Sequence, residues 1–278
     1  MTRTLVALLI AAALSGCGSS TSDPAVEASS GPSAGPPPAS MAALGDSITQ
    51  AFTTCGGLID CPGNSWATGD NPAVDSHADR ITDASGERPE TANLAVSGAK
   101  VAALPEQAAE AVLTGADYLT VLIGANDVCR PTEAEMTSVS EFETAVATSF
   151  DALSSGLPQA RLFVASVPDL YKLWEVGRSS PAARGVWALG ICQSMLADPG
   201  SDDPADEERR QRVRDRVIAY NEVLERACTE YGPNCRWDGG AVFEDAYTQA
   251  DLSFDWFHPS VQGQQRLAEG TYEAGFNW

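Results

Sequence analysis

Four short apolar runs lie along the chain, and each is bounded by glycine, proline, serine or asparagine. Runs of this length with such boundaries predict buried strands. The run YLTVLI, residues 118–123, is apolar almost throughout, which is typical of a strand buried on both faces of a parallel sheet. The predicted strands are residues 41–44, 92–96, 118–123 and 161–167.

Helical spacing of apolar residues occurs between and after these runs. In residues 140–153, apolar side chains recur at intervals of three and four, which predicts one buried helical face. These side chains are Phe142, Val146, Phe150 and Leu153. Strands that alternate with helices predict an α/β domain with a parallel sheet and helices on both of its faces. The predicted helices are residues 101–113, 140–153, 206–231 and 261–273.

Residues 170–204 show weak patterning, although they contain Trp174 and Trp187, and they end in an acidic segment with proline and glycine. In folds of this class, ligands bind beyond the carboxyl ends of the strands. We therefore interpret residues 170–204 as an insertion or lid-like loop over that edge of the sheet.

Residues 1–40 differ from the rest of the chain. Arg3 precedes the apolar run LVALLIAAAL, and small residues follow it, which predicts a secretory signal peptide over residues 1–16. The run is too short to cross a bilayer. The LSGC sequence resembles the lipobox of bacterial lipoproteins, which implies cleavage before Cys17 and lipid on its sulfur; an ordinary cleaved signal is the alternative. Residues 17–40 are rich in serine, proline and glycine and predict a tether, followed by one domain over residues 41–278.

The chain is strongly acidic, with 17 basic and 38 acidic residues and a formal net charge of −21. Such a surface repels phosphate backbones, so nucleic acid is not an expected partner. It also provides no attraction to anionic lipid head groups. Contact with a membrane is therefore expected only through the lipid on Cys17. No feature of the sequence determines an oligomeric state, and we take a monomer as the expectation.

Seven cysteines are present, and six remain if Cys17 carries lipid. An even number in an exported chain predicts disulfides, although sequence alone leaves about 15 connectivities open for six cysteines. We favour three disulfides, and in two of them the paired cysteines are close in sequence and bracket a turn-like segment. The favoured pairs are Cys55–Cys61, Cys129–Cys192 and Cys228–Cys235. A zinc site is not expected, because there is no CxxC pair and no histidine near these cysteines.

Residues suited to acyl transfer follow three of the predicted strands. Ser47, after the first strand, is a candidate nucleophile, and residues 48–52 predict a first helical turn whose dipole favours negative charge there. Gly98 and Asn126, after the second and third strands, offer N–H donors to an oxyanion. Near the C-terminus, Asp255 lies three residues before His258, so its carboxylate can orient the imidazole as a general base.

Each of these residues also has a purely structural explanation. Serine is a preferred helix N-cap, and glycine and asparagine are common in turns. The segment DWFHPS can be a surface turn, with Pro259 suited to the first position of the final helix. His77, the other histidine, lies among polar loop residues and is expected to be exposed or locally bonded. Only the joint occurrence of the candidate residues at one sheet edge favours catalysis.

Four segments resemble the conserved blocks of the SGNH (GDSL) hydrolases in order and spacing: LGDSITQ, NLAVSGAKV, VLIGANDV and DWFHPSVQGQQRLAE. The resemblance covers residues 41–278 and implies a flavodoxin-like three-layer α/β/α sandwich with a mostly parallel central sheet. It implies that Ser47 is the nucleophile, His258 the base and Asp255 the triad acid. It also implies an oxyanion hole formed by the backbone N–H groups of Ser47 and Gly98 and the Asn126 side chain. The cysteines and long loops are similar to those of the secreted actinobacterial esterase/lipase branch.

The sequence therefore predicts an exported serine esterase or lipase, either a cell-envelope lipoprotein or extracellular, that acts on small-molecule or lipid esters without a metal or organic cofactor. A carbohydrate O-deacetylase, a phospholipase or a thioesterase would use the same residues. A non-catalytic binding lipoprotein is a third alternative, which the intact set of catalytic residue types argues against. The tryptophan side chains could stack against sugars, or they could be buried in the core. The tryptophans concerned are Trp66, Trp174, Trp187, Trp237 and Trp256.

Overall fold

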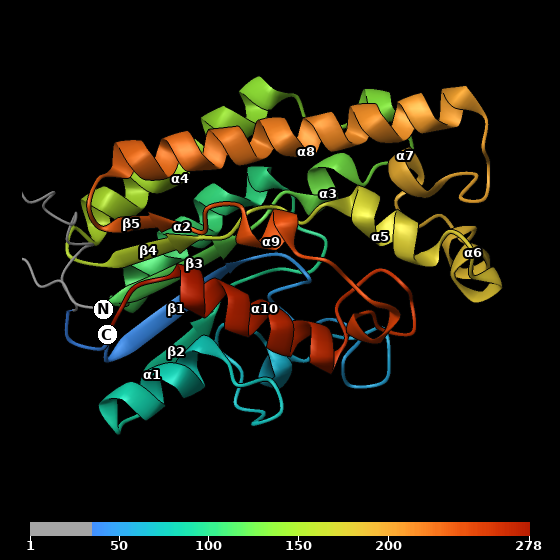
Figure 1. Cartoon of the computed structure of the whole chain (residues 1–278). Helices are drawn as coiled ribbons and strands as arrows, with labels where there is room; N and C mark the ends of the chain where they lie inside the picture. The colour runs from blue at the N-terminus through green and yellow to red at the C-terminus, as the bar shows by residue number, and fades with distance from the viewer. Residues whose placement is uncertain (1–34) are drawn as a thin grey trace, which may run out of the picture. The chain divides into compact units, whose positions relative to one another are not determined.

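The computed structural model describes residues 35–278. The predicted signal peptide, the lipid site at Cys17 and residues 17–34 of the predicted tether lie outside the described residues. Within residues 35–278 the chain forms a five-stranded parallel sheet with the order β2-β1-β3-β4-β5 (Figure 1). This order is flavodoxin-like, and the predicted α/β fold is confirmed. The strands are β1 (Ser40–Gly45), β2 (Glu90–Asn93), β3 (Tyr118–Leu122), β4 (Arg161–Val164) and β5 (Cys235–Trp237).

The central strands follow the predicted apolar runs closely. β1 pairs with β3 from Met41–Tyr118 to Gly45–Leu122, and both strands are almost wholly buried. The prediction for β2 was wrong in its bounds, because the strand begins at Glu90 and ends at Asn93 instead of covering residues 92–96. β2 is an edge strand, so exposed polar residues can occupy its ladder with β1, and the apolar pattern does not mark its start.

β5 and several short helices were not predicted. β5 has three half-buried residues and pairs with β4 on one side, which is too short for a recognisable apolar pattern. β4 ends at Val164, earlier than the predicted residue 167. Outside residues 170–204, the other helical elements that were not predicted are α1 (His77–Ser85), α3 (Ala125–Val128), α9 (Ala241–Glu244) and the 3-10 turns Pro62–Asn64, Glu133–Glu135 and Gln249–Asp251. The 3-10 turn Val101–Ala103 lies within the predicted helix of residues 101–113.

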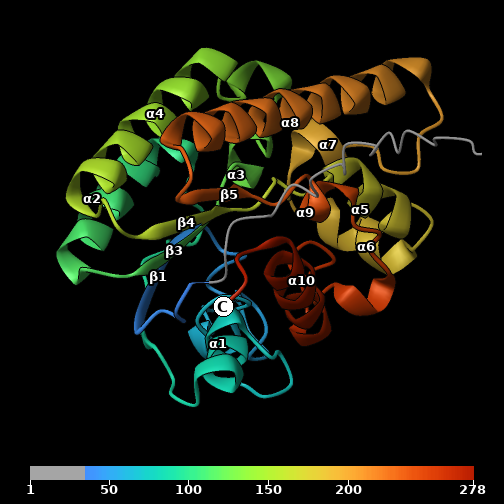
Figure 2. The same cartoon turned by 60° about the vertical axis from the view of Figure 1, so that its left-hand side comes forward.

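Helices cover both faces of the sheet. α2 (Leu104–Thr114), α4 (Val139–Gly156) and α8 (Pro204–Tyr231) lie on one face, and α1 (His77–Ser85) and α10 (Val261–Ala274) lie on the other (Figures 1 and 2). The predicted helices are confirmed, with ends that move by a few residues. The predicted apolar face of α4 is buried, and the ring of Phe142 stacks on Tyr220 of α8 with centroids 4.0 Å apart.

The weakly patterned residues 170–204 form helices instead of an irregular loop. They contain α5 (Leu170–Gly177), α6 (Pro181–Trp187) and α7 (Gln193–Leu196). Trp174 and Trp187 are fully buried, and Trp187 Nε1 donates to the carbonyl of Trp256 at 3.1 Å. The segment is thus packed into the domain and bonded to the loop that carries His258. Its helices are too short for the apolar spacing to be read from the sequence.

The favoured cysteine pairs are bonded among the residues that the structure describes: Cys55–Cys61, Cys129–Cys192 and Cys228–Cys235. Disulfides of this kind persist in oxidising compartments, so they indicate a location outside the cytoplasm. Between residues 35 and 278, no helix is both long enough and apolar enough to span a membrane.

The expectation of a loop position for His77 was wrong. His77 is the first residue of α1 and is fully buried, with Nδ1 2.9 Å from Tyr118 Oη and Nε2 2.8 Å from Thr271 Oγ1. It therefore links α1, β3 and α10. Burial, together with the charge of Arg80, lowers the pKa of His77 to about 3, so the ring is neutral. The polar residues around it in the sequence concealed this position, because its partners are distant along the chain.

Candidate active site

The predicted nucleophile and base meet at the carboxyl edge of the sheet. Ser47 follows β1, and its Oγ lies 2.9 Å from His258 Nε2. On the other side of the imidazole, Nδ1 lies 2.6 Å from Asp255 Oδ2. With a proton on Nδ1, His258 donates to Asp255, and Nε2 accepts the hydroxyl hydrogen of Ser47. The structure thus places Ser47, His258 and Asp255 in one hydrogen-bonded chain.

The backbone of the catalytic loop holds Asp255 in place. Asp255 Oδ1 accepts the N–H groups of Phe257 at 3.1 Å and of His258 at 3.0 Å. Burial disfavours the charged carboxylate, but the hydrogen bond and charge of His258 and the two N–H groups outweigh it. The pKa of Asp255 therefore lies below its usual value. The carboxylate stays ionised and can stabilise an imidazolium on His258.

His258 precedes the final helix, as expected, but Pro259 is not in its first turn. Pro259 pairs with Leu252 in an antiparallel bridge, and Ser260 is the N-cap, whose side chain accepts from Gly263 N–H. The bridge closes the loop that contains Asp255 and His258, and the backbone of Ser253 also donates to the carbonyl of His258 at 2.8 Å. The base is therefore mounted on a closed loop instead of on a helix end.

The helix predicted after Ser47 is absent, which is a correction for residues 48–52. Those residues form turns, and Ala51 has a φ of 49°. Their local backbone hydrogen bonds span three, four and five residues, as in Ala51 N–H to Ile48 O and Phe52 N–H to Ser47 O, and so do not form the regular ladder of a helix. Ile48 O also accepts Gln264 Nε2 at 2.8 Å, and Thr49 O accepts Asn93 Nδ2 at 2.9 Å. A helix dipole therefore does not act on Ser47.

A glycine and a buried glutamine hold the chain just before Ser47. A Cβ on Gly45 would lie 2.3 Å from the carbonyl oxygen of Leu122, so only glycine lets β1 approach β3 this closely. Gln107 on α2 accepts Gly45 N–H at 2.8 Å and donates to Gly45 O at 2.9 Å. Sequence reasoning missed Gln107, because a lone glutamine in a helical pattern carries no signal of this role.

Of the predicted oxyanion donors, Asn126 lines the same cavity as Ser47. Asn126 is in α3, directly after β3, and its Nδ2 donates to the carbonyl of Ala99 at 3.0 Å. Ala99 follows Gly98, which is exposed and has a φ of 81°. The structure therefore brings Asn126 and the turn at Gly98 together.

Two buried carboxylates support this arrangement and were not singled out from the sequence. Asp46 Oδ1 accepts Ile48 N–H at 2.9 Å, and Oδ2 lies 3.4 Å from Asn126 Nδ2. Burial raises the pKa of Asp46 to about 7, with Asp127 adding to the rise and Ile48 N–H and His258 opposing it. Asp127 accepts Val101 N–H at 2.9 Å, so it fixes the turn after Gly98 against α3. Burial likewise raises the pKa of Asp127.

A cavity of about 310 Å³ opens at Ser47, Asn126 and His258. Apolar side chains from the segment after β4 and from the catalytic loop, including Pro168, Leu173 and Leu252, form part of its lining. This lining suits a largely apolar small molecule with its reactive group at the polar end.

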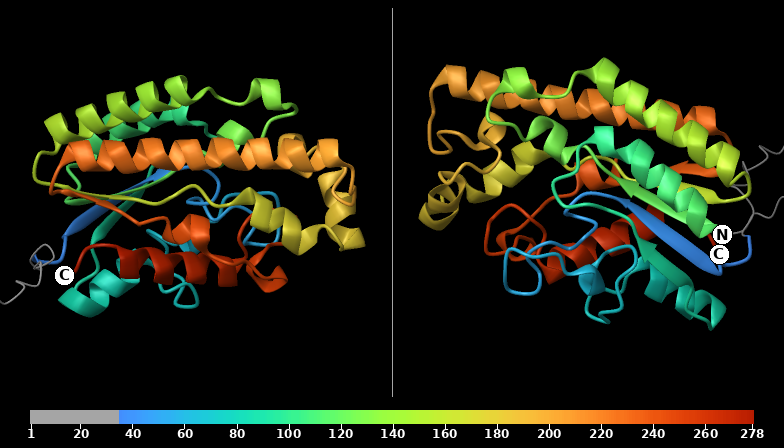
Figure 3. Two further views of the ribbon diagram at one scale, coloured as in Figure 1. Left: turned by 45° about the horizontal axis from the view of Figure 1, so that its top comes forward. Right: turned by 180° about the vertical axis from the view of Figure 1, so that it is seen from behind.

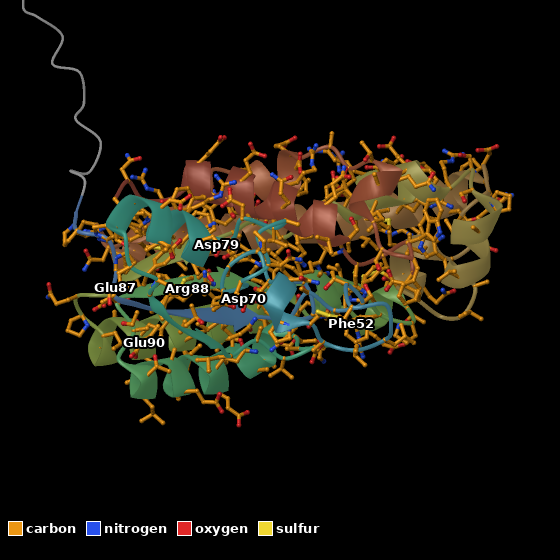
Figure 4. The ribbon with its side chains drawn as sticks, turned by 90° about the horizontal axis from the view of Figure 1, so that it is seen from below. Phe52, Asp70, Asp79, Glu87, Arg88 and Glu90 are labelled. Carbon is orange, nitrogen blue, oxygen red and sulfur yellow. A yellow bond between two sulfur atoms is a disulfide. The ribbon has the colours of Figure 1, made fainter. Side chains whose placement is uncertain are left out.

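Phenylalanines flank the imidazole of His258. The ring centroid of Phe52 lies 4.9 Å from that of His258, and Phe257 lies at 5.0 Å. Figure 4 shows Phe52 on the turn after β1, at the other end of this face from Glu87 and Glu90. The two rings therefore pack against the base on its loop.

The tryptophans do not form a sugar-binding surface as a group. Trp66, Trp174 and Trp187 are fully buried and belong to the core. Trp237 and Trp256 are half-buried. Trp66, Trp174 and Trp187 are therefore core residues, as the structural alternative predicted.

Comparisons with known proteins give a family match and a shared fold. Residues 43–266 match the GDSL-like Lipase/Acylhydrolase family. None of the curated proteins compared with the chain matches it. Solved structures with the same fold include LAE5, an alpha/beta hydrolase enzyme from the metagenome of Lake Arreo, with 19% identity over 85% of this chain and 94% of that one and a TM-score of 0.53.

Other solved structures show a similar level of likeness. The lipase/acylhydrolase from Enterococcus faecalis has 16% identity over 84% of this chain and 94% of that one, with a TM-score of 0.50. A family 3 carbohydrate esterase from Clostridium thermocellum has 14% identity over 84% of this chain and 93% of that one, with a TM-score of 0.51. At these identities the structures establish the shared fold.

Proposed function

The chain belongs to the GDSL-like lipase/acylhydrolase family, and we propose that it hydrolyses carboxylic esters through an acyl-enzyme on Ser47. The observation that carries the proposal is the hydrogen-bonded chain from Ser47 Oγ to His258 Nε2 at 2.9 Å and from His258 Nδ1 to Asp255 at 2.6 Å. A serine with a positioned base and an orienting carboxylate is the arrangement required for nucleophilic acyl transfer.

The reaction follows from the positions of the protons. Ser47 Oγ attacks the acyl carbon while its proton passes to His258 Nε2, and the imidazolium then protonates the departing alcohol. Water attacks the acyl-enzyme with His258 again as base, and Ser47 recovers its proton as the acid leaves. Asp255 remains ionised throughout and stabilises the imidazolium.

The developing oxyanion requires donors on one side of Ser47. We assign this role to the backbone N–H groups of Ser47 and Gly98 and to the Asn126 side chain. The support is the position of Asn126 after β3, where it lines the same cavity as Ser47 and His258. Each donor of this kind contributes about 10²–10³ in rate in comparable sites.

Substrate class separates the remaining candidates. The apolar lining of the cavity favours an alkyl ester, whereas the burial of Trp66, Trp174 and Trp187 does not favour stacking of a glycan. The alternatives are tested by comparing activity on p-nitrophenyl esters with activity on three other substrates. Acetylated xylan tests for an O-deacetylase, phospholipids test for a phospholipase, and acyl thioesters test for a thioesterase. A non-catalytic binding lipoprotein is disfavoured by the contact between Ser47 and His258.

The location that we propose is the cell envelope. The basic start, apolar run and LSGC sequence support export and lipid attachment at Cys17, and residues 17–40 would tether the domain of residues 41–278. Membership of the secreted actinobacterial branch would account for the disulfides. Cys17→Ala should move the protein from the membrane fraction to the soluble fraction, and an unchanged distribution would contradict lipidation.

The catalytic proposal is tested with Ser47→Ala and a fluorophosphonate probe. Wild-type protein should hydrolyse p-nitrophenyl butyrate and be labelled at Ser47, and the variant should do neither. Near-normal turnover by the variant would eliminate the mechanism. Turnover by neither protein, without labelling at Ser47, would favour a binding role.

A further inference from the structure

The helix α10 forms one wall of the cavity that opens at Ser47. Gln264, in its first turn, donates to the carbonyl of Ile48 at 2.8 Å and accepts Trp66 N–H at 2.9 Å. These bonds hold the start of α10 against the residue that follows the nucleophile. The cavity continues from there along the helix, because its lining includes Gly263, Leu267 and Gly270. Spacings of four and three place these residues on one face.

The opposite wall comes from the end of β3 and from α9. Leu122, at the end of β3, and Val242 of α9 are both buried and line the cavity. α9 and α10 lie side by side in Figures 1 and 3. The part of the cavity that runs along α10 is therefore an apolar groove between this helix and the sheet. We call it the α10 groove.

The outer rim of the α10 groove is polar. Arg266 is paired with Asp245, and Glu269 and Glu273 occupy the following turns of the helix. Because its guanidinium is held by Asp245, Arg266 offers little attraction to an anion, and the neighbouring carboxylates repel one. The groove is suited to an uncharged apolar chain that begins at Ser47.

We infer that the α10 groove binds the acyl chain of the ester and that Gly270 is a specificity-determining residue for its length. This inference rests on the proposed function. From Gln264 to Gly270 the helix rises about 9 Å, and to Glu273 about 14 Å. An extended chain advances about 1.2 Å per bond. Acyl chains of about eight to twelve carbons therefore match the groove, whereas acetyl leaves it empty and palmitoyl exceeds it.

Chain length should affect catalysis steeply within this range. Each methylene that moves from water into an apolar site contributes up to about fourfold in kcat/KM. The increase should stop where the groove ends. We therefore expect kcat/KM to be highest for acyl chains of about eight to twelve carbons. Below this length kcat/KM rises because each added methylene is buried, and above it kcat/KM falls because the chain is longer than the groove.

Gly270 provides a direct test. A Cβ at Gly270 would meet no heavy atom of the described residues within 4 Å, although the residue lines the groove. A larger side chain there therefore enters open space instead of displacing the backbone. Leucine is also a much better helix former than glycine, so Gly270→Leu should fold. At Gly263, by contrast, a Cβ would lie 2.2 Å from the carbonyl of Asp251, so that position is unsuitable.

The matched control is Gly185→Leu in α6. Gly185 is an exposed helical glycine whose Cβ would likewise meet nothing within 4 Å in the described part of the chain. The measurement is kcat/KM for p-nitrophenyl esters from C2 to C16 and, separately, for acetates of straight-chain alcohols. Wild-type protein and Gly185→Leu should share an optimum at C8–C12. Gly270→Leu should lower the C10-to-C2 ratio at least tenfold, whereas Gly185→Leu should leave that ratio within about twofold of wild type.

Three results would overturn the inference: an unchanged acyl profile in Gly270→Leu, a shift in the alcohol series instead, or a wild-type optimum at acetate. The inference and the proposed function fail in different ways. Ser47-dependent turnover with an unaltered chain-length profile removes only the assignment of the groove. Absence of Ser47-dependent turnover on every ester removes the function itself.

Discussion

The carboxylate of Asp46 lies 3.4 Å from the side-chain nitrogen of Asn126, with Asp46 fully buried directly before the nucleophile. The two residues are 80 positions apart, and their contact joins the end of β1 to α3. Asp46 also accepts Ile48 N–H, so one side chain positions both the turn at Ser47 and the Asn126 amide. It is therefore a positioning residue for the proposed oxyanion hole.

Replacing Asp46 by Asn should lower activity and raise stability. Loss of a hydrogen bond to a charged group costs about 1.5–3 kcal/mol, so kcat should fall about tenfold to a hundredfold with a smaller change in KM. The raised pKa, about 7, means that ionised Asp46 opposes folding as pH rises from about 4 to 7. Its removal should stabilise the fold by up to about 4 kcal/mol above pH 7.

Thermal unfolding at pH 8 and pH 4 measures this effect, together with kinetics on p-nitrophenyl butyrate. The gain in Tm of Asp46→Asn should be present at pH 8 and lost at pH 4, where Asp46 is protonated in the folded protein. An equal loss of Tm at both pH values would show that Asp46 supports the fold and does not strain it.

His77 should make the protein sensitive to acid. Its folded pKa of about 3 lies below the usual value near 6.5, so the unfolded chain binds the proton first. Stability from this group is fully present above pH 6.5 and falls as pH drops toward 3, by up to about 5 kcal/mol. His77→Gln should flatten this dependence, although it should be less stable at pH 7 because the packing changes. The fall in Tm between pH 7 and pH 4, compared in wild type and variant, checks the prediction. An equal fall in both would contradict it.

Asp255 and His258 should differ in importance. His258→Ala removes the proton carrier and should lower kcat by about 10⁵–10⁶. Asp255→Ala leaves the base but removes its orientation and the ionic partner, so a loss of about 10³–10⁴ is expected. Single-turnover acylation with a p-nitrophenyl ester separates the two. A larger loss for Asp255→Ala would mean that the loop, and not the carboxylate charge, is the main determinant.

Among the disulfides, stability should depend most on Cys129–Cys192, which bonds Cys129 to the segment of residues 170–204. Cys129–Cys192 closes a loop with a sequence separation of 63, whereas Cys228–Cys235 has a separation of 7. Loop-closure entropy predicts losses of about 4 kcal/mol for Cys129→Ser/Cys192→Ser and about 2.5 kcal/mol for Cys228→Ser/Cys235→Ser. Midpoints of guanidinium unfolding measure the difference. A larger effect of the short loop would show that native-state packing, instead of chain entropy, dominates.

The local parts of the fold could be predicted from consecutive residues. The apolar runs of β1 and β3 and the spaced apolar face of α4 report burial that repeats along the chain with a fixed period. Ser47, Gly98, Asn126 and the pair Asp255 and His258 were singled out as candidates because they follow predicted strands or precede the last predicted helix. The blocks that contain them are short and contiguous.

Contacts between distant segments could be known only from the tertiary structure. Gln107 is 62 residues from Gly45, and His77 is 194 residues from Thr271. The burial of these polar residues, the turns in place of a helix after Ser47 and the helices within residues 170–204 all depend on partners that the local pattern does not contain. Periodicity records which face of a segment is buried, whereas packing in three dimensions decides what that face meets.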